Sequence, residues 1–186
     1  MKIRRVMQKG HSEPVAAIYR QDRWVPLPSA LEGSDLTGRL GASVARDVIS
    51  LLALSPENRW EIGKRVDDHL ASGAGLDSAY ADTPVIPFFP KSYRDFMLFE
   101  GHVTGAGRGF ARQFMPRAYR AAVLYEKIFR TTFPKFRPHP LWYQKPIYYM
   151  GNHLSFVTEG HPVTFPSYSR ALDYELELGA VIVHPV

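Results

Sequence analysis

The sequence predicts an α+β protein with a small N-terminal domain of strands and helices, residues 1–80, followed by the first part of a mixed, β-rich domain, residues 81–186. Three observations lead to this prediction. Short alternating apolar segments open the chain, helical spacing of apolar residues follows from Asp35, and aromatic segments with strand character fill the second half. The Pro-containing segment "GAGLDSAYADTPVIPFFPKS" separates the halves and places a boundary near residue 80.

Composition narrows the class of protein. Apolar residues make up 45% and charged residues 22%, close to the average for globular proteins, so disorder, collagen and coiled coil are disfavoured. There is no cysteine, which excludes disulfides and thiolate chemistry. No window reaches the ~20 apolar residues of a membrane span, and no apolar run of signal-peptide length follows "MKIRRVMQKGHSEPV". We therefore expect a cytoplasmic protein with no membrane partner.

Local patterns predict the elements of the first domain. The segments "KIRRVM", "PVAAIYR" and "RWVPL" alternate as strands, and the tight turn "QD" suggests a small antiparallel meander. A helix is predicted from a Ser34 or Asp35 cap to Leu52, where leucines and valines recur at helical spacing. A second helix is predicted from Ser55, because "SPEN" puts Pro56 at the first helical position.

The second half mixes one helix with several strands. The predicted helix spans residues 114–131, with a shared apolar face made by Phe114, Ala118, Ala121, Tyr125, Ile128 and Phe129. The segment "PKFRPHPLWYQKP" contains four prolines and is not expected to be regular structure. Strands are predicted at "IYYMGNHLSFV", "PVTFP" and "LDYELELGAVIV", with a turn at "TEGH".

Positive charge is concentrated in one part of the chain, whose net charge is +5. From Arg108 to Lys145 there are nine Lys or Arg and one acid, Glu126. Such a stretch can contact nucleic acid or an anionic substrate, but basic residues along a helix are more often its solvated face. The aromatic residues have core spacing rather than the arrangement of a stacking platform, so we expect no nucleic-acid partner.

Acids alternate with apolar residues near the C-terminus, where Asp173, Glu175 and Glu177 share one side of the predicted strand. A half-exposed strand is the common explanation of such alternation. Two observations favour an interior strand instead. Three acids on one side of an exposed strand would repel each other, and the following "GAVIV" is apolar on both sides, as interior strands are. Acids on an interior strand need a cation, and carboxylates without cysteine favour a hard divalent ion.

A second polar cluster, Asp95, Glu100 and His102, lies in "RDFMLFEGH". An Asp near a His can supply a metal ligand and a general base, because imidazole titrates near neutral pH. A lone histidine is more often an ordinary surface residue. A catalytic or metal-binding role for this cluster is therefore favoured only in combination with the acidic segment of Asp173, Glu175 and Glu177.

The order "RDFMLFEGH", "WYQKPIYYMGN" and "GHPVTFPSYSRALDYELELGAVI" resembles the fumarylacetoacetate hydrolase family over residues 88–186. The resemblance implies a fumarylacetoacetase-like catalytic domain in which Mg²⁺, or alternatively Ca²⁺ or Mn²⁺, is held by Asp95, Glu175 and Glu177. It further implies His102 as the catalytic base and Tyr149 as a substrate-binding residue, with Asp173 in a supporting role. Arg108 and Arg112 are expected to hold a substrate carboxylate, from their charge and proximity alone.

The resemblance implies a metal-dependent hydrolase or lyase that cleaves carbon–carbon bonds in small oxo acids of the acylpyruvate or β-diketone type. Bond cleavage would leave an enolate that the ion stabilises. A homodimer is implied by family habit. The alternatives are a non-catalytic interaction module that uses the basic helix 114–131 to bind an anionic partner, and a structural fragment without activity.

The chain departs from the family pattern at its end. In the family, a fourth metal ligand, a Lys near the substrate and a Glu paired with the His follow the Glu-x-Glu strand, whereas this sequence ends nine residues after Glu177. We therefore expect the N-terminal part of a longer family member.

Overall fold

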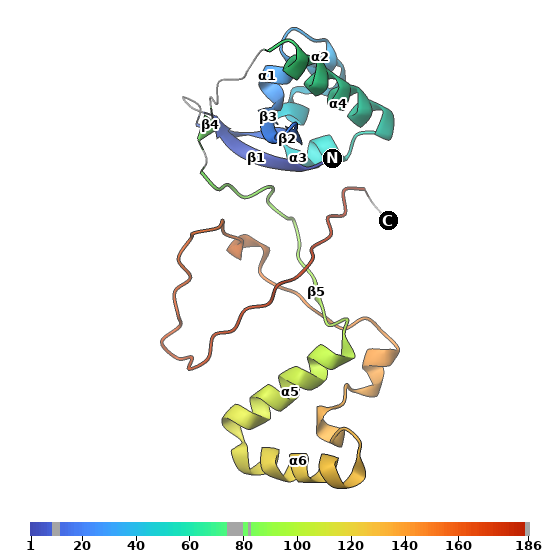
Figure 1. The fold of residues 1–186 in the computed structure, drawn as a ribbon, viewed down its shortest axis with the longest axis vertical. Helices are drawn as coiled ribbons and strands as arrows, with labels where there is room; N and C mark the ends of the chain where they lie inside the picture. Colours follow the sequence, from blue (N-terminus) through green and yellow to red (C-terminus); the bar gives the residue numbers. More distant parts are fainter. Residues whose placement is uncertain (9–11, 74–79, 82, 185–186) are drawn as a thin grey trace. The chain divides into compact units, whose positions relative to one another are not determined.

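The computed structural model describes residues 1–8, 12–73, 80–81 and 83–184 (Figure 1). The chain divides into two compact units, one formed by Met1–Phe89 with Ser155–Val186 and the other by Pro90–Leu154. The predicted mixture of α and β structure is confirmed. The boundary near residue 80 stays a prediction, and parts of the expected connection, residues 74–79 and 82, lie outside the described residues. No helix among the described residues is long and apolar enough to cross a bilayer.

The first unit contains an antiparallel sheet with strand order β3-β2-β1-β4 (Figure 1). The strands are β1 (Ile3–Gln8), β2 (Pro14–Arg20), β3 (Arg23–Pro26) and β4 (Tyr80–Ala81). The predicted meander is confirmed, and Ile18 pairs with Ile3 on one side and Val25 on the other. Gln21 and Asp22 have φ of 46° and 59°, as the tight turn of a two-residue hairpin requires. β4 was not predicted, because two residues are too few to show alternation.

Short helices follow the meander. They are α1 (Leu27–Leu31), α2 (Leu36–Leu40), the 3₁₀ helix η1 (Ala42–Ala45) and α3 (Val48–Leu52). The single helix predicted from Asp35 to Leu52 is wrong, because Gly41 leaves the helical region with φ of 93°. Asp47 is extended and starts α3 anew by accepting a hydrogen bond from the Ser50 amide. The apolar spacing continued across both breaks because all the pieces face one core.

The helix predicted from Ser55 is confirmed as α4 (Pro56–Ala71). The Ser55 side chain accepts a hydrogen bond from the Asn58 amide, Pro56 occupies the first turn, and Glu57 places an acid at the positive end of the helix dipole.

The main hydrophobic core lies between this helical layer and the sheet. Its largest fully buried side chains include Ile18, Leu27, Leu51, Ile62 and Val66, drawn from β2, α1, α3 and α4. Elements distant in sequence therefore share one core in the first unit.

The β-rich character was predicted for residues 81–186, and the described residues of that range form only very short strands. The unit Pro90–Leu154 consists mainly of two helices. Its elements are β5 (Asp95–Phe96), α5 (Glu100–Phe114), α6 (Pro116–Phe129), the 3₁₀ helices η2 (Pro134–Phe136) and η3 (Pro140–Tyr143), β6 (Tyr148–Tyr149) and η4 (His153–Ser155). The helix predicted over residues 114–131 corresponds to α6. α5 was missed because its four glycines lower intrinsic helix propensity. The Pro-rich segment has only the single turns η2 and η3.

The predicted apolar face of α6 is wrong in part. Ala118, Ala121 and Ile128 are exposed, whereas Ala122 is buried against Ala111 of α5 and Phe136. α6 therefore turns a different face to its neighbour, one that also carries Glu126, half-buried beside α5.

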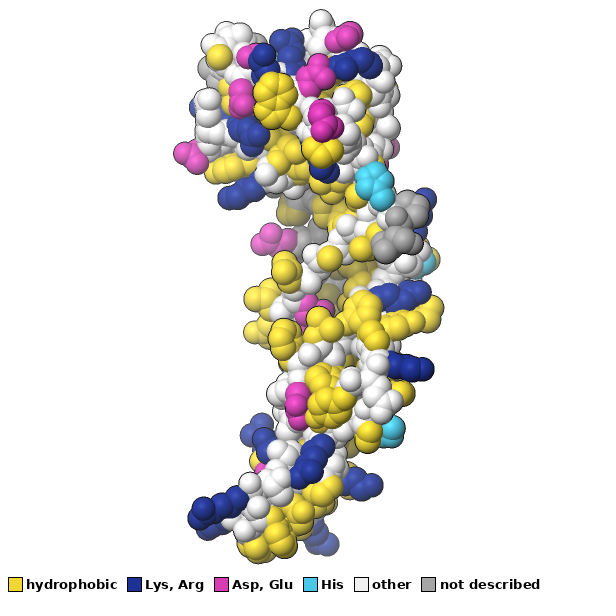
Figure 2. All heavy atoms as spheres, turned by 90° about the vertical axis from the view of Figure 1, so that its right-hand side faces the viewer, with side chains coloured by type: hydrophobic (Ala, Val, Ile, Leu, Met, Phe, Trp, Pro, Cys, Tyr) yellow, Lys and Arg dark blue, Asp and Glu magenta, His cyan; other side chains and the backbone are white. Residues whose placement is uncertain are grey.

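The strands predicted after residue 150 are not formed: residues 156–184 contain no helix or strand. The turn at "TEGH" is confirmed, since the His161 amide donates to the Thr158 carbonyl and Gly160 has φ of 78°. Leu176 and Leu178 are 97% and 100% exposed, so the expected interior position of this segment is wrong here. A strand needs hydrogen-bonding neighbours, and no strand among the described residues pairs with it. Figure 2 shows that hydrophobic side chains are common at the surface of the face that it draws.

Candidate functional site

The short ribbon formed by β5 and β6 brings two predicted site residues together. Asp95 pairs with Tyr149 and Phe96 with Tyr148 in antiparallel register. The Met97 amide extends the ladder by donating to the Ile147 carbonyl at 3.0 Å. Because directly opposed residues project to the same face of an antiparallel pair, the carboxylate of Asp95 and the phenol of Tyr149 share one side of the ribbon.

Aromatic side chains support this ribbon. The rings of Phe96 and Tyr148 pack with centroids 5.3 Å apart, and the guanidinium of Arg94 lies 5.5 Å from the Tyr148 ring centroid. Trp142 of η3 donates from Nε1 to the Met97 carbonyl at 2.7 Å. These contacts hold a two-residue strand pair that would be too short to persist alone.

Gly151, two residues after Tyr149, lies close against the ring of Tyr93. A Cβ atom at position 151 would collide with the Tyr93 ring, lying only 2.5 Å from its Cε1 atom. Glycine is therefore required here for space, because the side chain that precedes β5 packs on the backbone that follows β6. Sequence reasoning missed Tyr93, since nothing local to "KSYRD" indicates this contact.

His102 lies in the first turn of α5 and is exposed. Glu100 in the same turn accepts a hydrogen bond from the Tyr143 hydroxyl at 2.7 Å. This bond, with smaller contributions from desolvation and the Glu100 charge, raises the pKa of Tyr143 above its ordinary value. Within the predicted cluster of Asp95, Glu100 and His102, Glu100 thus links α5 to η3. This hydrogen bond anchors the beginning of the helix that carries His102.

The structure gives Arg108 and Arg112 different environments. Arg108 Nη2 donates to Glu126 Oε1 at 2.8 Å, and the same oxygen accepts from the Phe133 amide at 2.9 Å. The Arg108 hydrogen bond and then the Phe133 amide lower the pKa of Glu126. Arg112, one turn later on α5, is exposed. Arg108 therefore joins α5 to α6, and Arg112 is open to solvent.

The acidic segment of the C-terminal part lies in the other unit. Asp173, Glu175 and Glu177 are exposed, and the Tyr174 amide donates to the Asp173 carboxylate at 2.9 Å. Asp95 and His102 belong to the unit Pro90–Leu154. Among the described residues, no three His, Asp or Glu side chains are grouped so that they could hold a metal ion. The structure brings Asp95 and Tyr149 together within the unit Pro90–Leu154.

In a comparison with protein families, residues 118–186 match the family described as fumarylacetoacetate (FAA) hydrolase C-terminal. Tyr149, Glu175 and Glu177 lie inside the matched segment, whereas Asp95 and His102 precede it. Comparisons with curated proteins and with solved structures give no match.

Proposed function

We propose that the chain is a metal-dependent hydrolase or lyase of carbon–carbon bonds in small oxo acids, because residues 118–186 match the fumarylacetoacetate hydrolase family. The family match carries the proposal, because it covers the Glu-x-Glu pair and Tyr149. The pairing of Asp95 with Tyr149 adds support, since it places a carboxylate that precedes the match beside a residue within it.

The donor chemistry fits a hard divalent ion. Asp95, Glu175 and Glu177 offer carboxylate oxygens, which suit Mg²⁺ first and Ca²⁺ or Mn²⁺ as alternatives. A bound ion would polarise the oxygens of an acylpyruvate or β-diketone and stabilise the enolate charge that develops as the bond breaks. We propose these three residues as its ligands.

His102 and Tyr149 have separate proposed roles. His102 is exposed at the beginning of α5, where a neutral imidazole nitrogen can take a proton from the attacking water. Tyr149 is 60% exposed, so its hydroxyl can donate a hydrogen bond to a substrate carboxylate. The pairing across the ribbon keeps this hydroxyl on the same side as the Asp95 carboxylate.

The two arginines differ as partners for a substrate carboxylate. Arg108 would have to exchange the carboxylate of Glu126 for that of the substrate, which would also loosen the contact between α5 and α6. Arg112 is exposed and can bind a carboxylate without that loss. We therefore assign the stronger substrate contact to Arg112. The substrate class and a homodimeric state are also proposals, and both rest on the resemblance to the family.

Metal binding can be tested with carboxylate variants. We expect isothermal titration of the full chain with Mn²⁺ to show saturable binding that Glu175→Gln or Asp95→Asn weakens by about tenfold or more, since each change removes a charged ligand. Glu159→Gln is the control, an exposed acid of the same part of the chain with no assigned role, and should keep the affinity. Binding that is unaffected by Glu175→Gln, or equally weakened by Glu159→Gln, would refute the ligand set.

Catalysis is tested at His102. With an acylpyruvate substrate and saturating Mn²⁺, His102→Ala should lower kcat by about 100-fold or more while Mn²⁺ affinity stays unchanged. His161→Ala, a change in the turn at "TEGH", should leave kcat unchanged. If His102→Ala retains turnover, this histidine is not the base.

A second function is favoured by the surface of α6. Leu124, Ile128 and Phe129 are exposed on a helix that also carries Arg117, Arg120 and Lys127. An apolar and basic surface of this kind suits an anionic binding partner. If the chain neither binds Mn²⁺ nor turns over acylpyruvates, this non-catalytic interaction role becomes the preferred function.

A further inference from the structure

The segment between β5 and α5 is held at both ends by neighbouring residues of η3. Trp142 Nε1 donates to the Met97 carbonyl at 2.7 Å, and the Tyr143 hydroxyl donates to Glu100 Oε1 at the same distance. Met97 directly follows β5, and Glu100 is the first residue of α5. The two contacts therefore enclose a connection of just two residues, 98 and 99.

The conformation of η3 is itself fixed by local contacts. Pro140 occupies its first position, and His139 Nδ1 accepts a hydrogen bond from the Leu141 amide. The rings of Trp142 and Tyr143 meet edge to face, with centroids 4.9 Å apart. The two donors are thus held at a defined spacing where they contact the segment that leads into α5.

The first turn of α5 is weak by its own sequence. Phe99 at the N-cap has no side-chain oxygen that could accept a hydrogen bond from the amides of this turn. Gly101 and Gly105 follow, and glycine has the lowest helix propensity after proline. A Cβ at either position would meet nothing within 4 Å. The turn that carries His102 therefore depends on contacts from outside the helix.

η3 is also close in sequence to the second strand of the ribbon. It ends at Tyr143, and β6 follows after a short connection and carries Tyr149 opposite Asp95. The element that holds the beginning of α5 is thus joined to the strand that bears the proposed substrate-binding tyrosine. The contacts of η3 therefore relate His102 to both residues of the ribbon.

We propose that Tyr143 is a positioning residue for His102. Its hydrogen bond to Glu100 fixes the first turn of α5 and thereby the place of the imidazole relative to the ribbon of β5 and β6. For turnover, this inference rests on the hydrolase function proposed above, whereas the restraint on the turn is measurable without substrate or metal. Glu100 and Tyr143 are exposed, so removing their contact should cost a few-fold rather than orders of magnitude.

Hydrogen exchange of the Val103 amide reports on the first turn, because this amide donates to the Phe99 carbonyl at 3.2 Å. Tyr143→Phe keeps the ring and removes only the hydroxyl. We expect it to speed the exchange of Val103 in the full chain by about 3- to 10-fold. The Met115 amide, at the other end of α5, should exchange as before.

A second substitution separates positioning from a direct contact with the substrate. Gly101→Ala strengthens the same turn from within, because alanine raises helix propensity and its Cβ has space. In the Tyr143→Phe background it should return Val103 exchange to within about twofold of the original rate. With an acylpyruvate and saturating Mn²⁺, Tyr143→Phe should lower kcat by about 3- to 10-fold with little change in KM, and Gly101→Ala should restore most of kcat.

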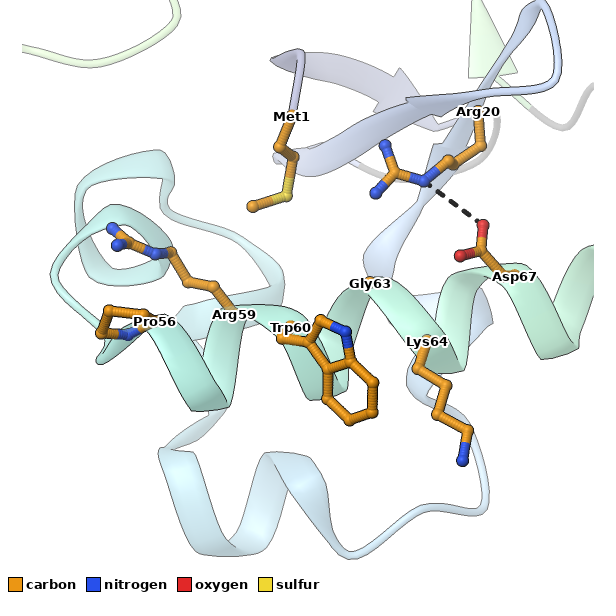
Figure 3. Close-up of a pocket in the computed structure, with 8 residues that line it drawn as sticks. All are labelled: Met1, Arg20, Pro56, Arg59, Trp60, Gly63, Lys64 and Asp67. Carbon is orange, nitrogen blue, oxygen red and sulfur yellow. Dashed lines mark ion pairs between the residues drawn. The ribbon is translucent and has the colours of Figure 1, made fainter.

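Two contacts of the first unit supply controls. The Tyr19 hydroxyl donates to Asp22 Oδ1 at 3.3 Å, so Tyr19→Phe removes the same kind of hydrogen bond elsewhere. Figure 3 shows the other contact, in the pocket along α4, where Arg20 Nε lies 3.3 Å from Asp67 Oδ1. Tyr19→Phe and Asp67→Asn should leave both Val103 exchange and kcat unchanged.

Unchanged Val103 exchange in Tyr143→Phe would overturn the proposal, whatever the turnover, as would equal acceleration in Tyr19→Phe. The proposal also fails if Gly101→Ala restores Val103 exchange while kcat stays low, because Tyr143 would then act on the substrate itself. A wild-type chain that turns over no acylpyruvate would count against the hydrolase function alone, since Val103 exchange would still decide whether Tyr143 fixes the turn.

Discussion

Replacing Gly151 with alanine tests how the ribbon of β5 and β6 is held. In the structure a new Cβ would lie 2.5 Å from Tyr93 Cε1 and closer still to Cδ1, and ordinary carbon contacts are about 3.5–4.0 Å, so the ring must recede by more than about 1 Å. Forcing a methyl group into a packed contact typically costs about 1–3 kcal/mol. Because Tyr93 precedes Asp95 by two residues and Gly151 follows Tyr149 by two, we expect the cost to appear as local opening of the ribbon.

The Met97 amide is the reporter, since it donates to the Ile147 carbonyl within this ribbon. A loss of about 1–3 kcal/mol should speed its hydrogen exchange by about 5- to 150-fold. Gly105→Ala is the matched control, because a Cβ at this exposed position of α5 meets nothing within 4 Å. That variant should stabilise α5 by roughly 0.5–1 kcal/mol and leave the Met97 amide protected.

A double-mutant cycle identifies the partner. In a Tyr93→Ala background, Gly151→Ala should no longer speed the exchange of the Met97 amide, because the colliding ring is gone. Unchanged Met97 exchange in Gly151→Ala alone would refute the steric argument, as would an effect that persists without Tyr93.

Three further predictions concern contacts outside the ribbon. Arg108→Gln should raise the pKa of Glu126, measured by carboxyl NMR titration, because the Arg108 hydrogen bond is the main cause of its lowered value. The stability that Glu126 contributes is present above the ordinary Glu pKa of about 4.3 and is lost as pH falls through the lowered folded value. Acid should therefore weaken the polar contact between α5 and α6. A Glu126 pKa unmoved by Arg108→Gln would contradict this. Asp47→Ala should destabilise the first unit by about 1 kcal/mol in urea unfolding, because it removes the cap of α3, whereas Asp47→Asn keeps an acceptor and should cost less. Leu51→Ala should cost about 2–5 kcal/mol, since Leu51 is fully buried, and a loss below 1 kcal/mol would show that the core relaxes around it.

The features predicted correctly from the sequence are those that depend on neighbouring residues alone. The beginning of α4 followed from Ser55 and Pro56, because capping needs only neighbouring residues. The hairpin at Gln21 and Asp22 followed for the same reason. The break at Gly41 was missed because apolar spacing continues through it, and α5 was missed because glycine propensity is outweighed by packing of Ala111 against Ala122.

Contacts between distant segments were not visible in the sequence pattern. Asp95 and Tyr149 were named from a resemblance to a family, and the structure shows that they are paired. Tyr93 over Gly151 could not be predicted, because the contact depends on the register of that pairing. The roles of Asp95, Glu175 and His102 stay predictions.

The wide separation in sequence of the proposed ligands has a thermodynamic consequence. An ion bound by both Asp95 and Glu175 would close a long loop of the chain, so part of its intrinsic binding free energy would be spent on that ordering. The observed affinity equals the intrinsic affinity reduced by the fraction of molecules in which the ligands meet. A tether or a bound molecule that favours the assembled arrangement would therefore tighten ion binding without touching a single ligand.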